Sequence, residues 1–240
     1  MNQQGDAMNS QNVLVRRQRV RDFAPPRRSR PTYHVTLTEQ GSWLHAPGSD
    51  FLFAYLQNDW PQTVIADMRA AFESALVMSS SIKAAVKTTS GQDVVNGLYL
   101  LNQAAMTTAM NSIDGMGETG VNTSSQQGSG TAVTINGQFF AAILGGLGGD
   151  VAPLLTYLTT EMGDVQAQTK QSSVTESFGT VIGMISLMPV FNVPVVTFQY
   201  VFSSSEVSKW YIGLNCASID YQSYNYSYTV VEYNYVAPKK

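Results

Sequence analysis

Cys216 is the side chain of this 240-residue sequence best suited to covalent chemistry, because it is the only thiol. A cysteine nucleophile needs a histidine base and an orienting group. The two histidines, His34 and His45, lie far from Cys216 along the chain, and no further motif joins them to it. Besides a nucleophile, Cys216 can be interpreted as an inert thiol in the core. It can also be interpreted as a thiol that carries an acyl chain, which needs only an accessible sulfur beside an apolar slot.

Metal and nucleotide chemistry are not indicated by the residue types. Structural zinc takes four Cys or His ligands, whereas the chain holds one cysteine and two histidines without a cluster. The glycine run 145–149 lacks the Lys-Ser/Thr of a P-loop and the strand-then-GxGxxG context of a dinucleotide fold. We therefore expect no metal and no cofactor, apart from a covalent fatty acid if Cys216 is acylated.

Arginine is concentrated at the N-terminus. Residues 1–30 hold seven arginines against two aspartates, whereas residues 31–240 hold seven basic residues against fifteen acids. We predict a disordered basic arm over 1–30 and a single domain over 31–240. Clustered guanidinium groups bind the phosphates of nucleic acid or of anionic lipids, and a solvated tail without a partner has the same composition. The arginines are Arg16, Arg17, Arg19, Arg21, Arg27, Arg28 and Arg30.

Charge is scarce in the remainder of the chain. Charged residues make up 13% of the sequence, about half the share in an ordinary soluble domain. One uncharged run separates Glu176 from Glu206 and is long enough to cross a bilayer. Pro189 and Pro194 interrupt this run, so a hairpin in the core is the better interpretation.

The N-terminal sequence also bears on location. No secretory signal is visible, because the arginine run leads into Asp22, Pro25 and Pro26 and not into an apolar stretch. We expect a cytoplasmic or membrane-associated protein, released by a non-classical route if it leaves the cell.

Periodicity predicts the elements that must position these residues. Apolar residues at spacings of three and four indicate helices in the middle of the chain, and alternating aromatic and β-branched residues indicate strands near its end. The predicted fold class is α+β, with the helical middle packed on a C-terminal antiparallel sheet. The predicted helices are Thr63–Thr88, Val94–Ile113 and Val151–Met162, with a loop at Gly115–Gly130; the predicted strands are Tyr33–Leu37, Val195–Phe202, Lys209–Ser218 and Tyr224–Tyr235.

The helical middle, the C-terminal sheet and the lone cysteine in WYIGLNCASIDY (210–221) resemble the Erwinia virulence factor Evf family. The resemblance implies an unusual α/β fold and a fatty acid held in thioester linkage on Cys216. The uncharged segments would then supply the apolar slot, and membrane targeting would follow. It also implies a role in bacterial persistence in the insect gut. The arginine arm is not taken from the family, and it would add the second, basic signal that a singly acylated protein needs.

Three hypotheses of function follow. The first is a non-enzymatic virulence protein that associates with membranes, with a membrane or fatty-acyl chain as partner and an unknown host factor. The second is a coat or assembly subunit whose arginine arm binds nucleic acid. The third is a cysteine-dependent acyl-transfer enzyme, which requires a histidine within hydrogen-bond reach of Cys216.

Overall fold

One mixed β-sheet runs through the part of the chain that the computed structural model describes, which is residues 33–46, 51–91, 98–99, 101–161, 178–203 and 220–235. The strands follow the order β1-β2-β3-β6-β7-β8-β5, and β4 pairs with β6 beside this path. All neighbours are antiparallel except β3 and β6. The strands are β1 (His34–Leu37), β2 (Gly41–His45), β3 (Phe51–Gln57), β4 (Leu98–Tyr99), β5 (Met116–Thr131), β6 (Phe178–Met188), β7 (Val193–Ser203) and β8 (Asp220–Tyr235).

Both faces of the sheet are buried, and strand β3 shows why. Its sequence FLFAYLQ is apolar at six consecutive positions, all of them buried. Because side chains alternate between the faces of a strand, Leu52, Ala54 and Leu56 join one core cluster. Phe51, Phe53 and Tyr55 join the other. A continuous apolar run is therefore the expected sequence of a central strand covered on both sides.

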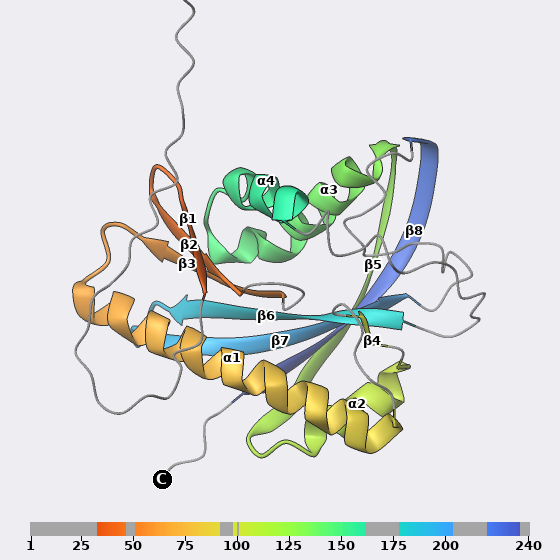
Figure 1. The fold of residues 1–240 in the computed structure, drawn as a ribbon, viewed down its shortest axis with the longest axis horizontal. Coiled ribbons are helices and arrows are strands. Elements are labelled where there is room, and N and C mark those ends of the chain that lie inside the picture. Colours follow the sequence, from red (N-terminus) through yellow and green to blue (C-terminus); the bar gives the residue numbers. More distant parts are fainter. Residues whose placement is uncertain are drawn as a thin grey trace, which may run out of the picture. The chain divides into compact units, whose positions relative to one another are not determined.

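Helix α1 (Gln62–Ser90) and helix α2 (Gln103–Asn111) cover the first face (Figure 1). Along α1 the buried side chains follow the helical period. This helix begins after Pro61 and ends at Gly91, whose positive φ of 70° suits glycine. The buried residues are Val64, Met68, Phe72, Ala75, Ile82 and Val86.

Helices α3 (Ala132–Leu144) and α4 (Ala152–Glu161) pack on the second face. A short 3₁₀ turn, η1 (Gly145–Leu147), and Gly148 at φ 77° separate them. The glycine-rich run thus ends α3 and lets the chain reverse into α4, as glycine's access to positive φ allows. Trp43 of β2 ties this connection to the sheet, because its indole N–H donates to the Asp150 carbonyl oxygen at 2.6 Å.

The α+β class predicted from the sequence is confirmed, although the sheet is larger than its C-terminal strands. The helices predicted at Thr63–Thr88 and Val151–Met162 correspond to α1 and α4, and the core hairpin around Pro189 and Pro194 is the β6–β7 pair. Residues 1–30 and the strand predicted at 209–218 lie outside the described residues.

Two element predictions are wrong. The glycine- and serine-rich stretch predicted as a loop is strand β5, because its backbone pairs with β8 from Met116 to Thr131. Pairing with a neighbour outweighs the low strand propensity of Gly and Ser. The helix predicted from Val94 is shorter, since α2 begins only at Gln103, after Asn102 accepts the Ala105 N–H at 2.9 Å as an N-cap.

Candidate functional site

The residues predicted from the sequence as lipid or nucleic-acid contacts are not placed by the structure. Cys216 and the seven arginines of residues 1–30 all lie outside the described residues. The stretch that contains Cys216 joins Ser203 to Asp220. Ser203 pairs with Phe178, at the end of the β6–β7 hairpin opposite its turn. The two described residues that flank the cysteine stretch therefore mark the opposite end of the sheet from that turn.

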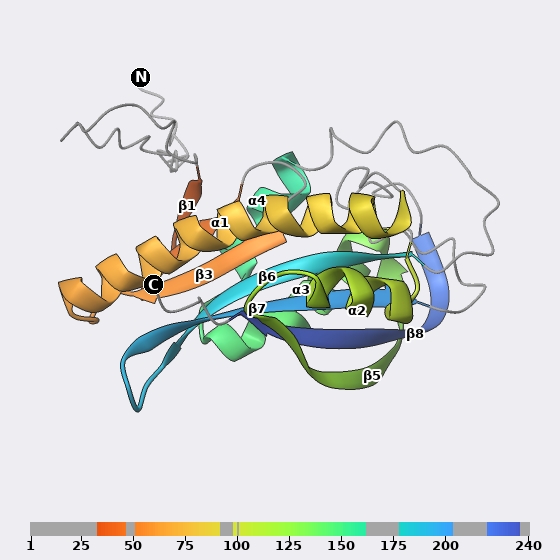
Figure 2. The same cartoon turned by 90° about the horizontal axis from the view of Figure 1, so that it is seen from below.

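The β6–β7 hairpin extends beyond the sheet at its turn. The last described pair between β3 and β6 joins Ala54 to Ile185. The last described pair between β7 and β8 joins Val196 to Tyr235, where the described part of β8 ends. Ile185 and Val196 are partners of each other. Beyond this pair, the hairpin continues for three more pairs and a turn, and no other described strand joins it. Figure 2 shows the β6–β7 turn bending away from the rest of the sheet.

The projecting end of the hairpin is apolar. Val190 is 82% exposed and Phe191 is 70% exposed. Met188 and Val193, at the ends of the two strands, are also exposed. We call these four side chains the hairpin tip. Isolated exposed hydrophobic residues are common on soluble proteins, but four within six positions form a continuous patch of the kind that marks an interaction site.

The turn has a defined backbone. The Phe191 N–H donates to the Met188 carbonyl oxygen at 3.3 Å. Asn192 has φ 50°, a left-handed conformation that asparagine tolerates better than most residues. The run from Ser177 to Ser205, which includes the whole hairpin, carries no charged side chain. The tip is therefore a structured apolar projection without ionisable groups of its own.

A cavity of about 460 Å³ lies at the foot of the projecting hairpin. Its walls come from the end of β3, the first turn of α1, the glycine-rich η1 segment and the hairpin itself. Aromatic, amide and aliphatic side chains all line it, and none of the lining residues is charged. The lining includes Tyr55, Gln57, Trp60, Ser186, Leu187 and Asn192.

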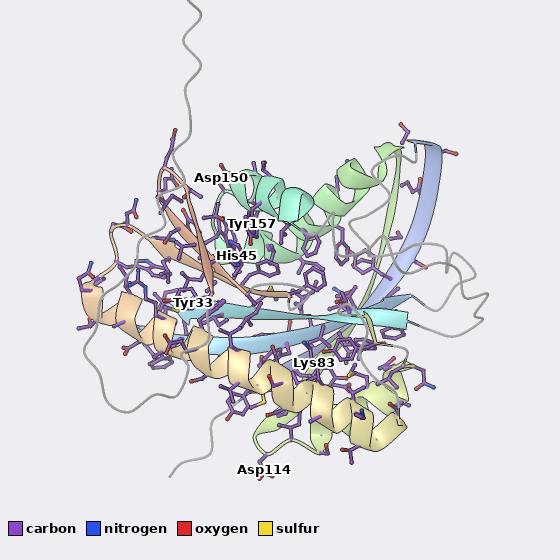
Figure 3. All side chains as sticks on the ribbon, viewed as in Figure 1. Tyr33, His45, Lys83, Asp114, Asp150 and Tyr157 are labelled. Carbon is purple, nitrogen blue, oxygen red and sulfur yellow. The ribbon has the colours of Figure 1, made fainter. Side chains whose placement is uncertain are left out.

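The two histidines lie next to each other in the sheet. Their position relative to Cys216 is not described, because Cys216 lies outside the described residues. His34 and His45 are partners across β1 and β2, with ring centroids 5.5 Å apart. The ring of Tyr157 of α4 lies against that of His45, with ring centroids 4.3 Å apart. Figure 3 labels both residues. The Thr36 hydroxyl lies 3.0 Å from His45 Nε2. Burial, followed by the nearby His34, lowers the pKa of His45 to about 4, so His45 is neutral at pH 7 and links the β1–β2 edge to α4.

Sequence reasoning identified the hairpin but missed its exposed tip. The uncharged run between Glu176 and Glu206 was interpreted as a hairpin in the core, and periodicity does not distinguish a buried strand end from an exposed one. The available signal was the pair of prolines around Val190 and Phe191, because prolines at a turn keep large apolar residues out of the sheet ladder.

Two other kinds of site are absent from the described residues. Within those residues no three His, Cys, Asp or Glu side chains gather as metal ligands. None of the described helices combines the length and apolarity needed to cross a bilayer.

Comparison with known proteins gave similarity at the level of solved structures. No family model and no curated protein sequence matches the chain. The Evf virulence factor is 15% identical, with a TM-score of 0.43 over 74% of this chain and 66% of its own. A delta-endotoxin is 13% identical, with a TM-score of 0.36 over 91% of this chain and 93% of its own. Activated Cyt2Ba from Bacillus thuringiensis subsp. israelensis is 9% identical, with a TM-score of 0.36 over 79% of this chain and all of its own. The Evf protein that the sequence resembles is thus among the similar structures, and this chain spans just under two thirds of it.

Proposed function

We propose that this protein is a non-enzymatic membrane-associating protein whose hairpin tip enters the lipid bilayer. The observation that carries the proposal is the charge-free β6–β7 hairpin, which continues past its last described pairs with β3 and β8 and exposes Val190 and Phe191 at its turn. An apolar projection of this kind is stabilised when lipid replaces water around it. Because no charged side chain lies in the hairpin, insertion does not require an ion to leave water.

The length of the projection suits the outer part of a bilayer. Three residue pairs at about 3.3 Å per residue advance the turn by about 10 Å beyond the last pair shared with the sheet. Amphipathic elements that bind the membrane interface enter it by about 5–10 Å. Backbone groups next to the turn remain paired within the hairpin, which limits the cost of placing them in lipid.

The tip alone gives weak binding. Transfer of Val190 and Phe191 from water to lipid contributes about 2 kcal/mol for each side chain. A sum of about 4 kcal/mol corresponds to a dissociation constant near 1 mM. A single acyl chain is also a marginal anchor, with a binding constant of about 10⁴ M⁻¹. Two such contributions together reach stable association, and we therefore include acylation of Cys216 in the proposal as the second attachment.

The role in the host is the finer part of the proposal. The sequence resemblance to the Evf family motivates a virulence function that supports persistence of a bacterium in an insect host. Loss of colonisation by a Cys216→Ser strain that still makes folded protein would support this role, and unchanged colonisation by that strain would contradict it.

Vesicle flotation tests membrane association directly. We expect Val190→Ser combined with Phe191→Ser to lower the partition of the protein into neutral vesicles by roughly tenfold or more, with an unchanged free energy of unfolding. The matched control is Val35→Ser combined with Leu37→Ser, because these side chains are exposed on edge strand β1, outside the hairpin. Equal flotation of the tip variant and this control would overturn the proposal.

Acylation of Cys216 is tested by intact mass. Protein purified from its native host should carry a fatty-acyl increment that neutral hydroxylamine removes, and the Cys216→Ser variant should lack it. An unmodified native mass would remove the acyl chain from the proposal and leave the hairpin tip as the attachment.

A further inference from the structure

The cavity at the foot of the hairpin is continuous with the tip. Pro189 and Asn192, the first and last residues of the turn, both line it, and so do Ser186 and Leu187 just behind. A cavity of about 460 Å³ falls within the range of sites that bind small molecules. A lipid molecule next to the inserted tip therefore has direct access to the cavity.

The cavity lies at the level of lipid headgroups when the tip lies in hydrocarbon. Ser186 begins the three pairs of the projection, so the foot is about 10 Å behind the turn. Polar headgroups flank the hydrocarbon core on this scale. Trp60, at the cavity wall, is partly exposed, and tryptophan and tyrosine are enriched at the membrane–water interface. The insertion depth and the position of Trp60 thus both place the cavity at the membrane–water interface.

The lining selects among headgroups by charge. None of its residues carries a positive side chain, so an anionic headgroup gains no ion pair there. Trp60 instead supplies a partly exposed aromatic ring, which attracts quaternary ammonium groups. The Gln57 amide and the Ser186 hydroxyl supply hydrogen-bond donors for a phosphate diester.

We propose that this cavity binds the phosphocholine headgroup of a membrane lipid, with the choline against Trp60. The inference rests on the proposed function for the supply of lipid, because the headgroup reaches the cavity when the tip enters the bilayer. The hairpin then contributes attachment through its tip and lipid selectivity through its foot.

A soluble lipid separates this binding from insertion. Calorimetric titration of the full chain with dihexanoylphosphatidylcholine, below its micelle concentration, should show saturable binding. Trp60→Ala should weaken this binding by roughly tenfold, and Trp60→Phe should restore most of it, since the ring carries the attraction. Gln57→Ala tests the cavity through a second side chain and is expected to weaken binding as well. The same titration with dihexanoylphosphatidylglycerol should give binding weaker by roughly tenfold.

The outcomes distinguish the two proposals. The Val190→Ser, Phe191→Ser variant should bind the soluble phosphocholine lipid normally while it loses vesicle flotation. Flotation of the native protein without binding of the soluble lipid would overturn the inference and leave membrane association intact. Binding of the phosphatidylglycerol analogue as tight as that of the phosphocholine lipid, or unchanged binding by both Trp60→Ala and Gln57→Ala, would also overturn it. Binding of the soluble lipid without flotation of native protein would overturn membrane association instead.

Discussion

His45 illustrates how a single buried side chain ties distant parts of this chain together. It is 1% exposed, pairs with His34 across the first two strands and contacts Tyr157 of α4. A charged imidazole in this position would lose water and face a second histidine. Burial accordingly lowers the pKa of His45 to about 4, from the ordinary 6.5. The contact between β1, β2 and α4 is therefore built around a neutral ring.

This pKa makes stability depend on pH in a definite direction. Between pH 6.5 and 4 the unfolded chain binds a proton at His45 that the folded chain does not, so stability falls as the pH is lowered through this window and levels off below it. The contribution at stake is about 3 kcal/mol. Urea unfolding of native protein and His45→Gln at a series of pH values should show that the variant lacks this part of the decline.

The control for this experiment is His34→Gln, which removes the lesser cause of the lowered pKa and leaves His45 buried. We expect this control to keep most of the decline between pH 6.5 and 4. Parallel pH profiles for native protein and His45→Gln would show that His45 is not the titrating group.

At the scale of elements, one tyrosine holds the β4–α2 segment against the sheet. The Tyr200 hydroxyl of β7 donates to the carbonyl oxygen of Leu101 at 2.6 Å and lies 3.3 Å from that of Tyr99. Burial raises the pKa of Tyr200 far above its ordinary value, so the hydroxyl remains a donor throughout the working pH range. The segment between α1 and α2 thus docks through a buried side chain and not through a long strand.

Removal of this hydroxyl should destabilise the protein. Tyr200→Phe leaves the buried Leu101 carbonyl without its donor, and we expect a loss of about 1–3 kcal/mol in the free energy of unfolding. Denaturant unfolding measures the loss, and hydrogen exchange should show it first in α2. Tyr235→Phe, at the partly exposed end of β8, is the matched control. A loss no larger than that of the control would contradict the role of Tyr200.

The elements that could be predicted from the sequence are those in which the spacing of apolar residues follows the face that is buried. Helix α1 shows a helical stripe because one of its faces packs on the sheet, and its residues Val64, Met68 and Ala75 are buried at spacings of four and seven. Strand β5 shows no pattern because it is an edge strand with mostly exposed side chains, held by its backbone pairing with β8. Pairing between segments a hundred residues apart leaves no local signature in composition, so this strand was predicted as a loop.

The hairpin tip was missed for a related reason. An apolar sequence is expected both for residues buried in a core and for residues that contact a membrane. The pairing of the neighbouring strands is needed to distinguish these two positions. The described pairing ends at Ile185 on one side and Val196 on the other. The sequence therefore predicted a hairpin, whereas the candidate site depends on where the described pairing of that hairpin with two other strands ends.

At the scale of the whole chain, the attachments proposed for the membrane start from different ends of the sheet. The tip lies at the turn of β6 and β7, whereas the stretch with Cys216 leaves the sheet at Ser203 and returns at Asp220. Strand β7 has eleven residues, which span about 36 Å. The tip and Ser203, the described residue at which the cysteine stretch begins, are therefore too far apart to share contacts.

The arginine arm supplies a third contribution, with a different dependence on salt. Seven arginines within residues 1–30 are attracted to an anionic surface, and this attraction is screened as ionic strength rises. We expect binding of the full chain to anionic vesicles to weaken steeply between about 0.05 and 0.5 M salt. Replacement of all seven arginines by glutamine should remove this dependence and leave the binding that the tip provides.

Arg69→Gln, at an exposed position on α1, is the control and should keep the salt dependence. An unchanged salt dependence in the seven-fold variant would contradict a role for the arm in lipid binding. Size-exclusion chromatography with absorbance at two wavelengths distinguishes the other use of the arm. Native protein that elutes as a nucleic-acid-containing assembly, which the seven-fold variant does not form, would assign the arginines to nucleic acid, because guanidinium groups neutralise its phosphates as they do those of lipids.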